Sequence, residues 1–218
     1  MATLLICNVF PDPSIPSKTI IVFEGIEASG KSLHINNVSN YLKKKGKKFI
    51  KIREPGGNYN SEKIRQLILN KKSKFNKVTD LLLYFAARSE NIEKIIKKNA
   101  GKKIILIDRF VDSTLAYQHY GMGININFIN IINKFLLKDI KVSFTFLHLV
   151  NRKDLKSRLY KRKNLNKYDK FSLNFYKKVQ IGFLKIANKN KTKYLKIDSN
   201  LAIKINKLKI IKKINKLI

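Results

Sequence analysis

Eight consecutive residues match G-x-x-x-x-G-K-[ST], a pattern whose residue types suit phosphate binding. They are Gly25, Ile26, Glu27, Ala28, Ser29, Gly30, Lys31 and Ser32. The two glycines allow the backbone to curl so that successive N–H groups point at one anion. A helix beginning near Lys31 would add the positive end of its dipole. The segment is therefore predicted to form a phosphate-binding loop (P-loop).

Two side chains of this loop suit nucleotide chemistry. The Lys31 ammonium can reach the β- and γ-phosphates, and the Ser32 hydroxyl can coordinate Mg²⁺. The surrounding sequence supports the motif, because the apolar run at 20–23 before it is typical of a buried parallel strand. Apolar residues recur after it at helical spacing, at Ile35, Val38, Tyr41 and Leu42. The order strand, glycine loop, helix predicts binding of a nucleoside triphosphate.

Two further polar clusters each follow an apolar run. Residues 53–57 read Arg-Glu-Pro-Gly-Gly, which predicts a turn open to close backbone approach beside a cation and a carboxylate. Asp108 and Arg109 end the second run, where an acid near a phosphate loop often holds Mg²⁺ or its waters. The forked guanidinium of Arg109 suits a phosphate group. An ordinary surface turn and an ordinary surface ion pair are the alternatives.

Tyr84 and Arg88 lie four residues apart in a helical pattern, so they share one helix face. An aromatic ring with a guanidinium one turn later is suited to bracket a nucleobase. A core aromatic with a partly buried arginine has the same pattern, so both interpretations stay open. Further along, Ala116, Tyr117 and Gln118 follow a predicted helix start at Asp112, Ser113 and Thr114 that looks well capped.

Basic residues crowd the segment from 158 to 170, between two predicted helices. They are Arg158, Lys161, Arg162, Lys163 and Lys167. In a phosphoryl-transfer enzyme such a segment would form a closing lid, since positive charge is needed around the transferred group. A solvated run of charge is the alternative for any single member. Arg158 and Arg162, four residues apart, are the preferred catalytic candidates.

Strand and helix patterns alternate along the chain. Strands are predicted at 20–24, 48–52, 103–107, 142–149 and 193–197, and helices near 31–45, 61–70, 79–99, 127–138, 152–161, 170–190 and 200–217. Such alternation predicts βαβ units and a parallel sheet covered on both faces. Ligands of these sheets bind at the carboxyl ends of the strands, which is where the polar clusters fall.

The charge of the chain is strongly positive, with 47 basic and 14 acidic residues and a formal net charge of +33. Such a charge suggests nucleic acid or an anionic membrane surface. The basic residues are mostly lysines spread over the whole chain, accompanied by abundant isoleucine and asparagine, which A/T-rich codons favour. We therefore attribute the charge to mutational bias and expect no nucleic-acid partner. The few arginines are Arg53, Arg65, Arg88, Arg109, Arg152, Arg158 and Arg162, and they merit attention first.

The ends of the chain and its one cysteine indicate location. Cys7 is alone, which excludes an intramolecular disulfide and fits a cytoplasmic protein. No apolar run reaches membrane-spanning length. Residues 1–18 contain three prolines and are expected to form a poorly ordered extension, or to reflect a start codon assigned too early. Leu201, Ile205, Leu208, Ile211 and Ile214 share a face of the last helix, which is expected to pack on the sheet rather than lie on a membrane.

Taken in order, these motifs resemble the bacterial type of the thymidylate kinase family over residues 19 to about 200. The similarity rests on the phosphate loop, the Arg-Glu-Pro-Gly-Gly turn at 53–57, the Ala-Ala-Arg helix at 86–88, the block from Asp108 to Gln118 and the basic lid. The resemblance implies a three-layer α/β P-loop nucleoside monophosphate kinase fold. That fold would have a five-stranded parallel sheet flanked by helices, in a single domain over 19–218 with a short lid at about 158–170.

The same resemblance implies transfer of the ATP γ-phosphate to dTMP to give dTDP in dTTP biosynthesis, with Mg²⁺, in a cytoplasmic homodimer. Carried over by position, Lys31 and the loop amides hold the ATP phosphates, and Arg53 and Arg109 hold the dTMP phosphate. Tyr84 stacks on thymine, and Arg88 and Thr114 address the base edge. Glu27 lies near the sugar, and Tyr117 crowds the 2′ position against a ribose. Asp108 and Gln118 complete the substrate-binding set.

The chain departs from the family pattern in three places. Its phosphate loop lacks the arginine that some relatives carry there, so the catalytic cation is expected from the lid. Residues 166–169 read Asn-Lys-Tyr-Asp where Asp-Arg-Phe-Glu is frequent, and His148 occupies a strand position where Asp is common. The alternatives are a kinase for another pyrimidine nucleotide or deoxynucleoside, a nucleic-acid-dependent P-loop ATPase, and an inactive relative.

Overall fold

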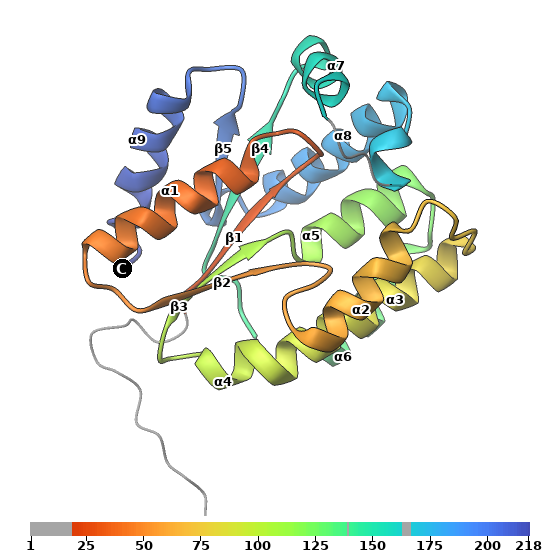
Figure 1. Cartoon of the computed structure of the whole chain (residues 1–218), viewed down its shortest axis with the longest axis horizontal. Coiled ribbons are helices and arrows are strands. Elements are labelled where there is room, and N and C mark those ends of the chain that lie inside the picture. The colour runs from red at the N-terminus through yellow and green to blue at the C-terminus, as the bar shows by residue number, and fades with distance from the viewer. Residues whose placement is uncertain (1–18, 139, 163–166) are drawn as a thin grey trace, which may run out of the picture.

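Five parallel strands form one sheet at the centre of the computed structural model, which describes residues 19–138, 140–162 and 167–218 (Figure 1). The strands are β1 (Ile20–Gly25), β2 (Phe49–Arg53), β3 (Ile104–Asp108), β4 (Phe144–Leu149) and β5 (Tyr194–Asp198). Their order in the sheet is β2-β3-β1-β4-β5, and every neighbouring pair is parallel. The predicted five-stranded parallel sheet is confirmed, and each strand begins and ends within two residues of its predicted bounds.

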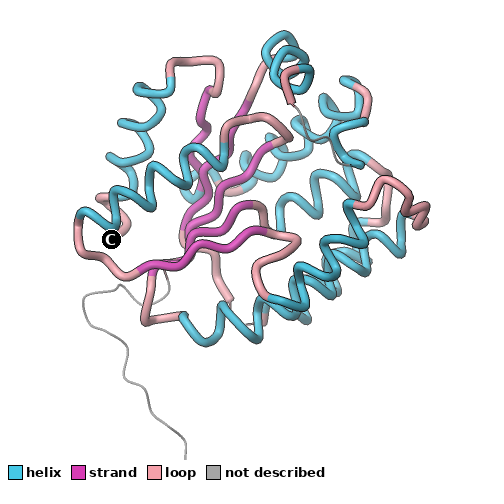
Figure 2. The backbone as a smooth tube through the Cα atoms, viewed as in Figure 1, coloured by secondary structure: helices cyan, strands magenta, loops and turns pink. Residues whose placement is uncertain are grey.

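Helices cover both faces of this sheet (Figure 2). They are α1 (Lys31–Lys44), α2 (Tyr59–Leu69), α3 (Lys77–Asn91), α4 (Lys97–Asn99), α5 (Val111–Thr114), α6 (Ile126–Leu137), α7 (Arg152–Tyr160), α8 (Leu173–Lys189) and α9 (Ile203–Ile214). Short π-helical segments η1 (Ile92–Ile96) and η2 (Leu115–Gly121) continue α3 and α5, and 3₁₀ turns form η3 (Lys167–Lys170) and η4 (Lys191–Lys193). Asn58 and Asn76 accept backbone N–H groups at the starts of α2 and α3, which begin two residues earlier than predicted.

The central strand β1 explains why the sequence reads as an unbroken apolar run. Ile21 and Phe23 pack into a core shared with α1 and α9, whereas Ile20 and Val22 face the opposite core. Because successive side chains of a strand point to opposite faces, both sets must be apolar when helices cover both faces. All six residues of β1 are buried.

The last helix packs on the sheet as expected, but only part of the predicted face is buried. Ile210 and Ile214 are buried in the core shared with α1, and Asn206 is buried beside them. Leu201, Ile205 and Leu208, which were predicted to lie on the buried face, are 48%, 52% and 63% exposed. The prediction was wrong for these three residues, whereas Ile214 is buried in this core and Ile211 packs against it, as predicted. The helix α9 carries apolar residues on two faces, and periodicity alone cannot tell which of them meets α1.

Some predictions concern residues outside the described ranges. These are the extension at 1–18, and Lys163 and Asn166 of the predicted lid. Among the described residues, no helix has the length and apolar character that crossing a bilayer requires.

Candidate active site

The predicted phosphate loop connects β1 directly to α1. Gly25 has a φ of 139°, and a Cβ at this position would lie 2.4 Å from the backbone oxygen of His148 on the neighbouring strand. Only glycine fits such a backbone and such a close approach. The Lys31 ammonium donates to the carbonyl oxygens of Gly25 (2.9 Å) and Ile26 (2.7 Å), so it lies folded over the loop.

Lys31 is 6% exposed, and its burial has an electrostatic consequence. Burial, and after it the neighbouring Arg109 cation, lower the pKa of Lys31 to about 8, although the carboxylates of Asp108, Glu27 and Glu24 oppose the shift. Below the loop, burial also lowers the pKa of His148 to about 3, with Lys31 as the next cause. A neutral imidazole therefore lies at this position, stacked on His34 with ring centroids 5.5 Å apart.

The carboxyl ends of β1 and β3 bring Ser32 and Asp108 together. The Ser32 hydroxyl donates to Oδ2 of Asp108 at 2.9 Å. A hydroxyl beside a carboxylate is a hard oxygen donor pair that fits Mg²⁺, which usually takes one or two protein oxygens and otherwise phosphates and waters. The described residues contain no cluster of three or more His, Cys, Asp or Glu side chains that would hold a metal ion by themselves.

Arg109 lies next to the loop and bonds to it directly. Its guanidinium donates to the Gly25 carbonyl (2.8 Å) and pairs with Glu27 (2.9 Å). The other oxygen of Glu27 accepts the Tyr117 hydroxyl. The φ of Arg109 is 65°, in the left-handed region that non-glycine residues rarely adopt. A cation is thereby held between the phosphate loop and the first turns after β3.

The helix after Arg109 is capped differently from the prediction. No side chain of Asp112, Ser113 or Thr114 caps α5. Instead Glu24 of β1 accepts the backbone N–H groups of Phe110 (2.7 Å) and Ser113 (3.2 Å). The helix start is therefore satisfied by a carboxylate 86 residues away from Phe110 in sequence, which local cap signals could not reveal.

Arg88 is a buried arginine that is hydrogen-bonded to four other residues. It is 2% exposed and pairs through Nε with Glu54 at 2.8 Å. Its terminal nitrogens donate to Asn133 (3.1 Å), to the Phe110 carbonyl (3.0 Å) and to the Thr114 hydroxyl (2.9 Å). Arg88 thus joins the turn at residues 53–57, α3 and α5. It also lines the cavity described below, so its two sequence-based interpretations are not exclusive.

Two arginines, Arg53 and Arg65, lie close to the end of β2. Arg53 is bound by Glu62 at 3.0 Å and its side chain is 56% exposed. Arg65, on the next turn of α2, donates to the Pro55 carbonyl at 2.6 Å. Burial lowers the pKa of Arg65, and the nearby Arg53 cation lowers it further. Two guanidinium groups therefore share one edge of the cavity.

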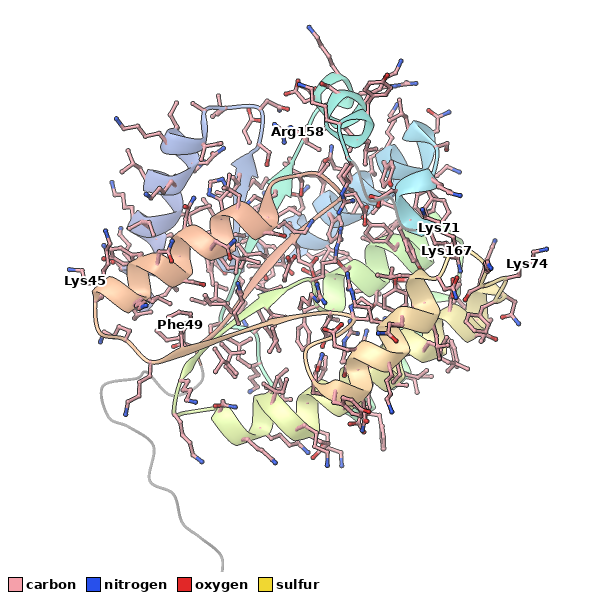
Figure 3. All side chains as sticks on the ribbon, viewed as in Figure 1. Lys45, Phe49, Lys71, Lys74, Arg158 and Lys167 are labelled. Atoms are coloured by element: carbon pink, nitrogen blue, oxygen red, sulfur yellow. The ribbon has the colours of Figure 1, made fainter. Side chains whose placement is uncertain are left out.

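The described part of the lid segment (residues 158–162 and 167–170) lies against the loop and α3. Arg158 on α7 donates to the carbonyl oxygens of Ala28 (3.2 Å) and Ser199 (2.7 Å), which places it beside the phosphate loop, as Figure 3 shows. Arg162 pairs with Asp169, and Lys167 pairs with Asp80 of α3 at 2.6 Å. Tyr168 lies edge-on to Tyr84 and Tyr117, with ring centroids 6.0 and 6.1 Å apart.

One cavity of about 560 Å³ joins these groups, a volume typical of small-molecule sites. Of the predicted site residues, it is lined by Glu27, Ala28, Ser29, Gly30, Lys31, Ser32, Arg53, Tyr84, Arg88, Asp108, Arg109, Thr114, Tyr117, Gln118, Arg158 and Arg162. Gly25 and Ile26 contribute their carbonyl oxygens to Lys31 but do not line it. Glu54, Arg65, Ser113 and Tyr168 also line it, although no site role was predicted for them. Residue type could have identified Arg65, because six of the seven arginines line this cavity.

Comparison with known proteins identifies the family. The family model described as thymidylate kinase matches residues 23–210. The chain belongs to the thymidylate kinase family. A thymidylate kinase of Sulfurihydrogenibium sp. is 41% identical over 186 residues, covering 84% of this chain and 90% of the relative. One of Thermosipho africanus is 39% identical, covering 77% and 83% of the two chains.

A solved thymidylate kinase structure shares the fold. The crystal structure of the thymidylate kinase from Ehrlichia chaffeensis superposes with a TM-score of 0.75 at 32% identity, over 92% of this chain and all of the other. The three-layer P-loop nucleoside monophosphate kinase fold is therefore confirmed. Thymidylate kinases are phosphotransferases, so the cavity between the phosphate loop and α3 is the candidate active site of a kinase.

Proposed function

We propose that the chain phosphorylates dTMP to dTDP with ATP, with the residues predicted from the sequence in the roles given below. One observation supports this most strongly. A single cavity connects the phosphate loop, through Arg109, to an aromatic pocket formed by Tyr84, Tyr117 and Tyr168. A donor triphosphate at the loop and an acceptor nucleotide in the pocket would then meet at Arg109.

The reaction moves the γ-phosphoryl group from ATP to a phosphate oxygen of dTMP, breaking the P–O bond to the β-phosphate and releasing ADP. Little covalent chemistry is required of the protein, so positioning and neutralisation of charge carry catalysis. Lys31 and the loop amides hold the donor phosphates. Arg109 and Arg53 hold the acceptor phosphate, with Arg65 beside them, and Arg158 and Arg162 supply positive charge from the lid side.

The hydroxyl of Ser32 and the carboxylate of Asp108 fit a magnesium ion, as their 2.9 Å contact brings both oxygens to one point at the loop. When bound there with ATP, Mg²⁺ would neutralise charge on the phosphate oxygens. Asp108 also stands in register with Arg53 across β2 and β3, so the metal-binding oxygens and the acceptor-phosphate cation lie at the same edge of the sheet.

Selection for a thymine deoxynucleotide is assigned to the aromatic pocket. Tyr84 provides a plane for stacking, and Arg88 holds the Thr114 hydroxyl while keeping an N–H group for the base edge. Tyr117, whose hydroxyl donates to Glu27, is assigned the role of crowding the 2′ position against a ribose. Gln118 lies beside them in the cavity wall.

Turnover with a panel of acceptors tests this proposal. ADP release from ATP and Mg²⁺ would be measured with dTMP, dUMP, dCMP, UMP and AMP in parallel. The proposal expects dTMP to be the preferred acceptor. Preference for another pyrimidine nucleotide, or for a deoxynucleoside added to the panel, would reassign the substrate within the kinase class. ATP hydrolysis stimulated by DNA or RNA, without transfer to any nucleotide, would contradict the proposal.

Binding of ATP is expected to weaken above pH 8. The triphosphate interacts with the charged form of Lys31, whose pKa is lowered to about 8 by burial. As pH rises through that value the free protein loses the proton, so the dissociation constant should rise up to about tenfold per pH unit. Titration calorimetry of ATP binding between pH 7 and 9.5 measures this, and binding should take up protons near pH 8.5. Lys31→Arg is the control, since its guanidinium stays charged; a pH-independent wild-type affinity would show that Lys31 does not hold the phosphates.

We also propose that the chain forms a homodimer through α3 and α6. These helices pack together through Leu81, Phe85 and Ile129, and their outward faces carry exposed apolar side chains. Those are Val78 (47% exposed), Leu82 (47%), Phe128 (38%), Ile131 (68%) and Phe135 (69%). An apolar patch on adjacent helices is typical of an interface between subunits.

Ile131→Asp is expected to convert the dimer to a monomer at micromolar concentration, because it places a charge in the apolar patch. Light scattering after gel filtration gives the mass. Leu208→Asp on α9 is a matched control with similar exposure (63%) and should leave the mass unchanged. Since the subunits are highly positive, higher salt should favour the dimer. A dimer that persists in Ile131→Asp would place the interface elsewhere.

We place the protein in the cytoplasm and assign it no nucleic-acid or membrane partner. In the view of Figure 3, amine nitrogens project from helices all around the outline rather than from one side. This spread supports mutational bias, because a nucleic-acid-binding surface usually gathers its cations in a stripe.

A further inference from the structure

Glu24 is a buried carboxylate that was not among the predicted site residues. It lies on β1 immediately before the phosphate loop and is 0% exposed. Burial raises its pKa, while hydrogen bonds from Ser113 and Phe110 and the charges of Arg109 and Lys31 oppose the shift. Burying a carboxylate costs free energy unless the group is hydrogen-bonded or paired with a cation. The hydrogen-bond partners of Glu24 therefore indicate its structural role.

Within the described residues, the Glu24 carboxylate accepts hydrogen bonds from the segment after Arg109. Oε1 accepts Phe110 N–H (2.7 Å) and Ser113 N–H (3.2 Å), and Oε2 accepts the Ser113 hydroxyl (2.6 Å). Ser113 is in turn within 3.3 Å of the Arg109 guanidinium. Glu24 thus ties the strand that carries the phosphate loop to the turn that carries Arg109.

The hydrogen bonds of Glu24 hold the backbone next to Arg109, whose conformation is unfavourable. Arg109 has a φ of 65°, a conformation that costs a non-glycine residue about 1 kcal/mol or more and persists only when the surroundings fix it. The preceding peptide is held by the Arg109 N–H, which donates to the Phe23 carbonyl at 3.0 Å. The following peptide is held by Glu24, which accepts the Phe110 N–H, and the peptide after that by Arg88, which donates to the Phe110 carbonyl oxygen.

We propose that Glu24 is a positioning residue for Arg109: it fixes the left-handed backbone there and so directs the guanidinium between the phosphate loop and the acceptor pocket. This inference rests on the proposed function, in which Arg109 touches the acceptor phosphate. Glu24 itself is not among the residues that line the cavity.

The length of the side chain distinguishes two variants. Glu24→Asp is one methylene shorter, so its carboxylate cannot reach both Phe110 N–H and the Ser113 hydroxyl from the same strand. Glu24→Gln keeps the length and an oxygen for the two N–H groups, and the Ser113 hydroxyl can rotate to accept from the amide. We expect Glu24→Asp to lower kcat about 30-fold with less than a threefold change in the KM for ATP, and Glu24→Gln to lower kcat less than fivefold.

A double-variant cycle with Arg109→Ala provides the test. If Glu24 acts through Arg109, Glu24→Asp should lower kcat about 30-fold in the wild type but less than threefold in Arg109→Ala. An equal factor in both backgrounds would overturn the proposal, because a purely structural loss would not depend on Arg109. Asn206→Ala is the control for general destabilisation. Asn206 is a buried polar residue of α9 bonded to the Asp198 carbonyl (2.7 Å), and its effects on kcat should be small and equal in both backgrounds.

Two further provisions keep the outcome clear. If Glu24→Asp does not fold, judged by its melting curve, the same cycle is run with Glu24→Gln, whose smaller effect must also vanish in Arg109→Ala. The acceptor used is the one that the wild type prefers in the panel above. A preference for an acceptor other than dTMP would then overturn the proposed substrate, whereas equal factors would overturn the role of Glu24.

Discussion

Arg109→Ala is expected to lower kcat/KM for dTMP by about 10²–10³ while leaving the melting temperature within a few degrees. A preorganised cation at a site of developing charge contributes about 3–4 kcal/mol to transition-state stabilisation, which corresponds to this factor. Arg109 bonds both to the Gly25 carbonyl and to Glu27, so it is fixed before any substrate arrives. Steady-state kinetics with dTMP varied at saturating ATP give the measurement.

Two other arginine substitutions calibrate this result. Arg152 is the one arginine in the sequence that does not line the cavity, so Arg152→Ala should retain nearly full activity. Arg109→Lys keeps the charge but loses the two-pronged geometry, and should recover only part of the rate. If Arg109→Ala turned over dTMP at a near-normal rate, the acceptor phosphate would have to bind elsewhere in the cavity.

Arg88→Met is expected to destabilise the protein by about 3–5 kcal/mol, the usual effect of removing one partner of a buried ion pair. The substitution would leave Glu54 unpaired, and its side chain is only 4% exposed. For a chain of this size the melting temperature should fall by about 10 °C. Thermal unfolding followed by circular dichroism measures the change, and the KM for dTMP should rise in parallel because Thr114 loses its partner.

The companion variant Glu54→Gln separates the charge from the packing. Adding Glu54→Gln to Arg88→Met removes the unpaired carboxylate and should recover part of the lost stability. Burial raises the pKa of Glu54. In Arg88→Met that carboxyl can be neutralised by protonation, so the deficit should shrink as pH falls and grow as pH rises. A deficit below about 1 kcal/mol that does not vary with pH would mean that Arg88 is an ordinary packing residue.

The sheet and the phosphate loop could be predicted from the sequence because their signals are local. β1 is apolar on both faces, and the loop's spacing leaves few alternative structures for its glycines. Arg109 and Asp108 were identified for a similar reason, since the residue after a parallel strand must lie at the binding edge. These features need no knowledge of what lies opposite them.

The features that the sequence did not reveal depend on distant partners. Glu24 appears as one more residue of a strand, and only the fold shows that it caps a helix 86 residues later. Tyr168 was noted as a departure in the lid, but its contact with Tyr84 spans a large part of the chain. The outward apolar face of α9 was assigned inward because two faces of that helix satisfy the same periodicity.

Six arginines line one cavity, so the arginines and the lysines of this molecule have different roles. Apart from Lys31 in the phosphate loop and Lys167, which pairs with Asp80, the described lysines are mostly exposed, and each is a flexible point charge that can be exchanged for another polar residue with little consequence. The arginines instead supply rigid planar forks, each engaged in a particular bond. The +33 of the chain is thus largely a property of its solvated exterior. That exterior charge could be redesigned for solubility or crystallisation by lysine replacement while the reacting centre keeps its shape.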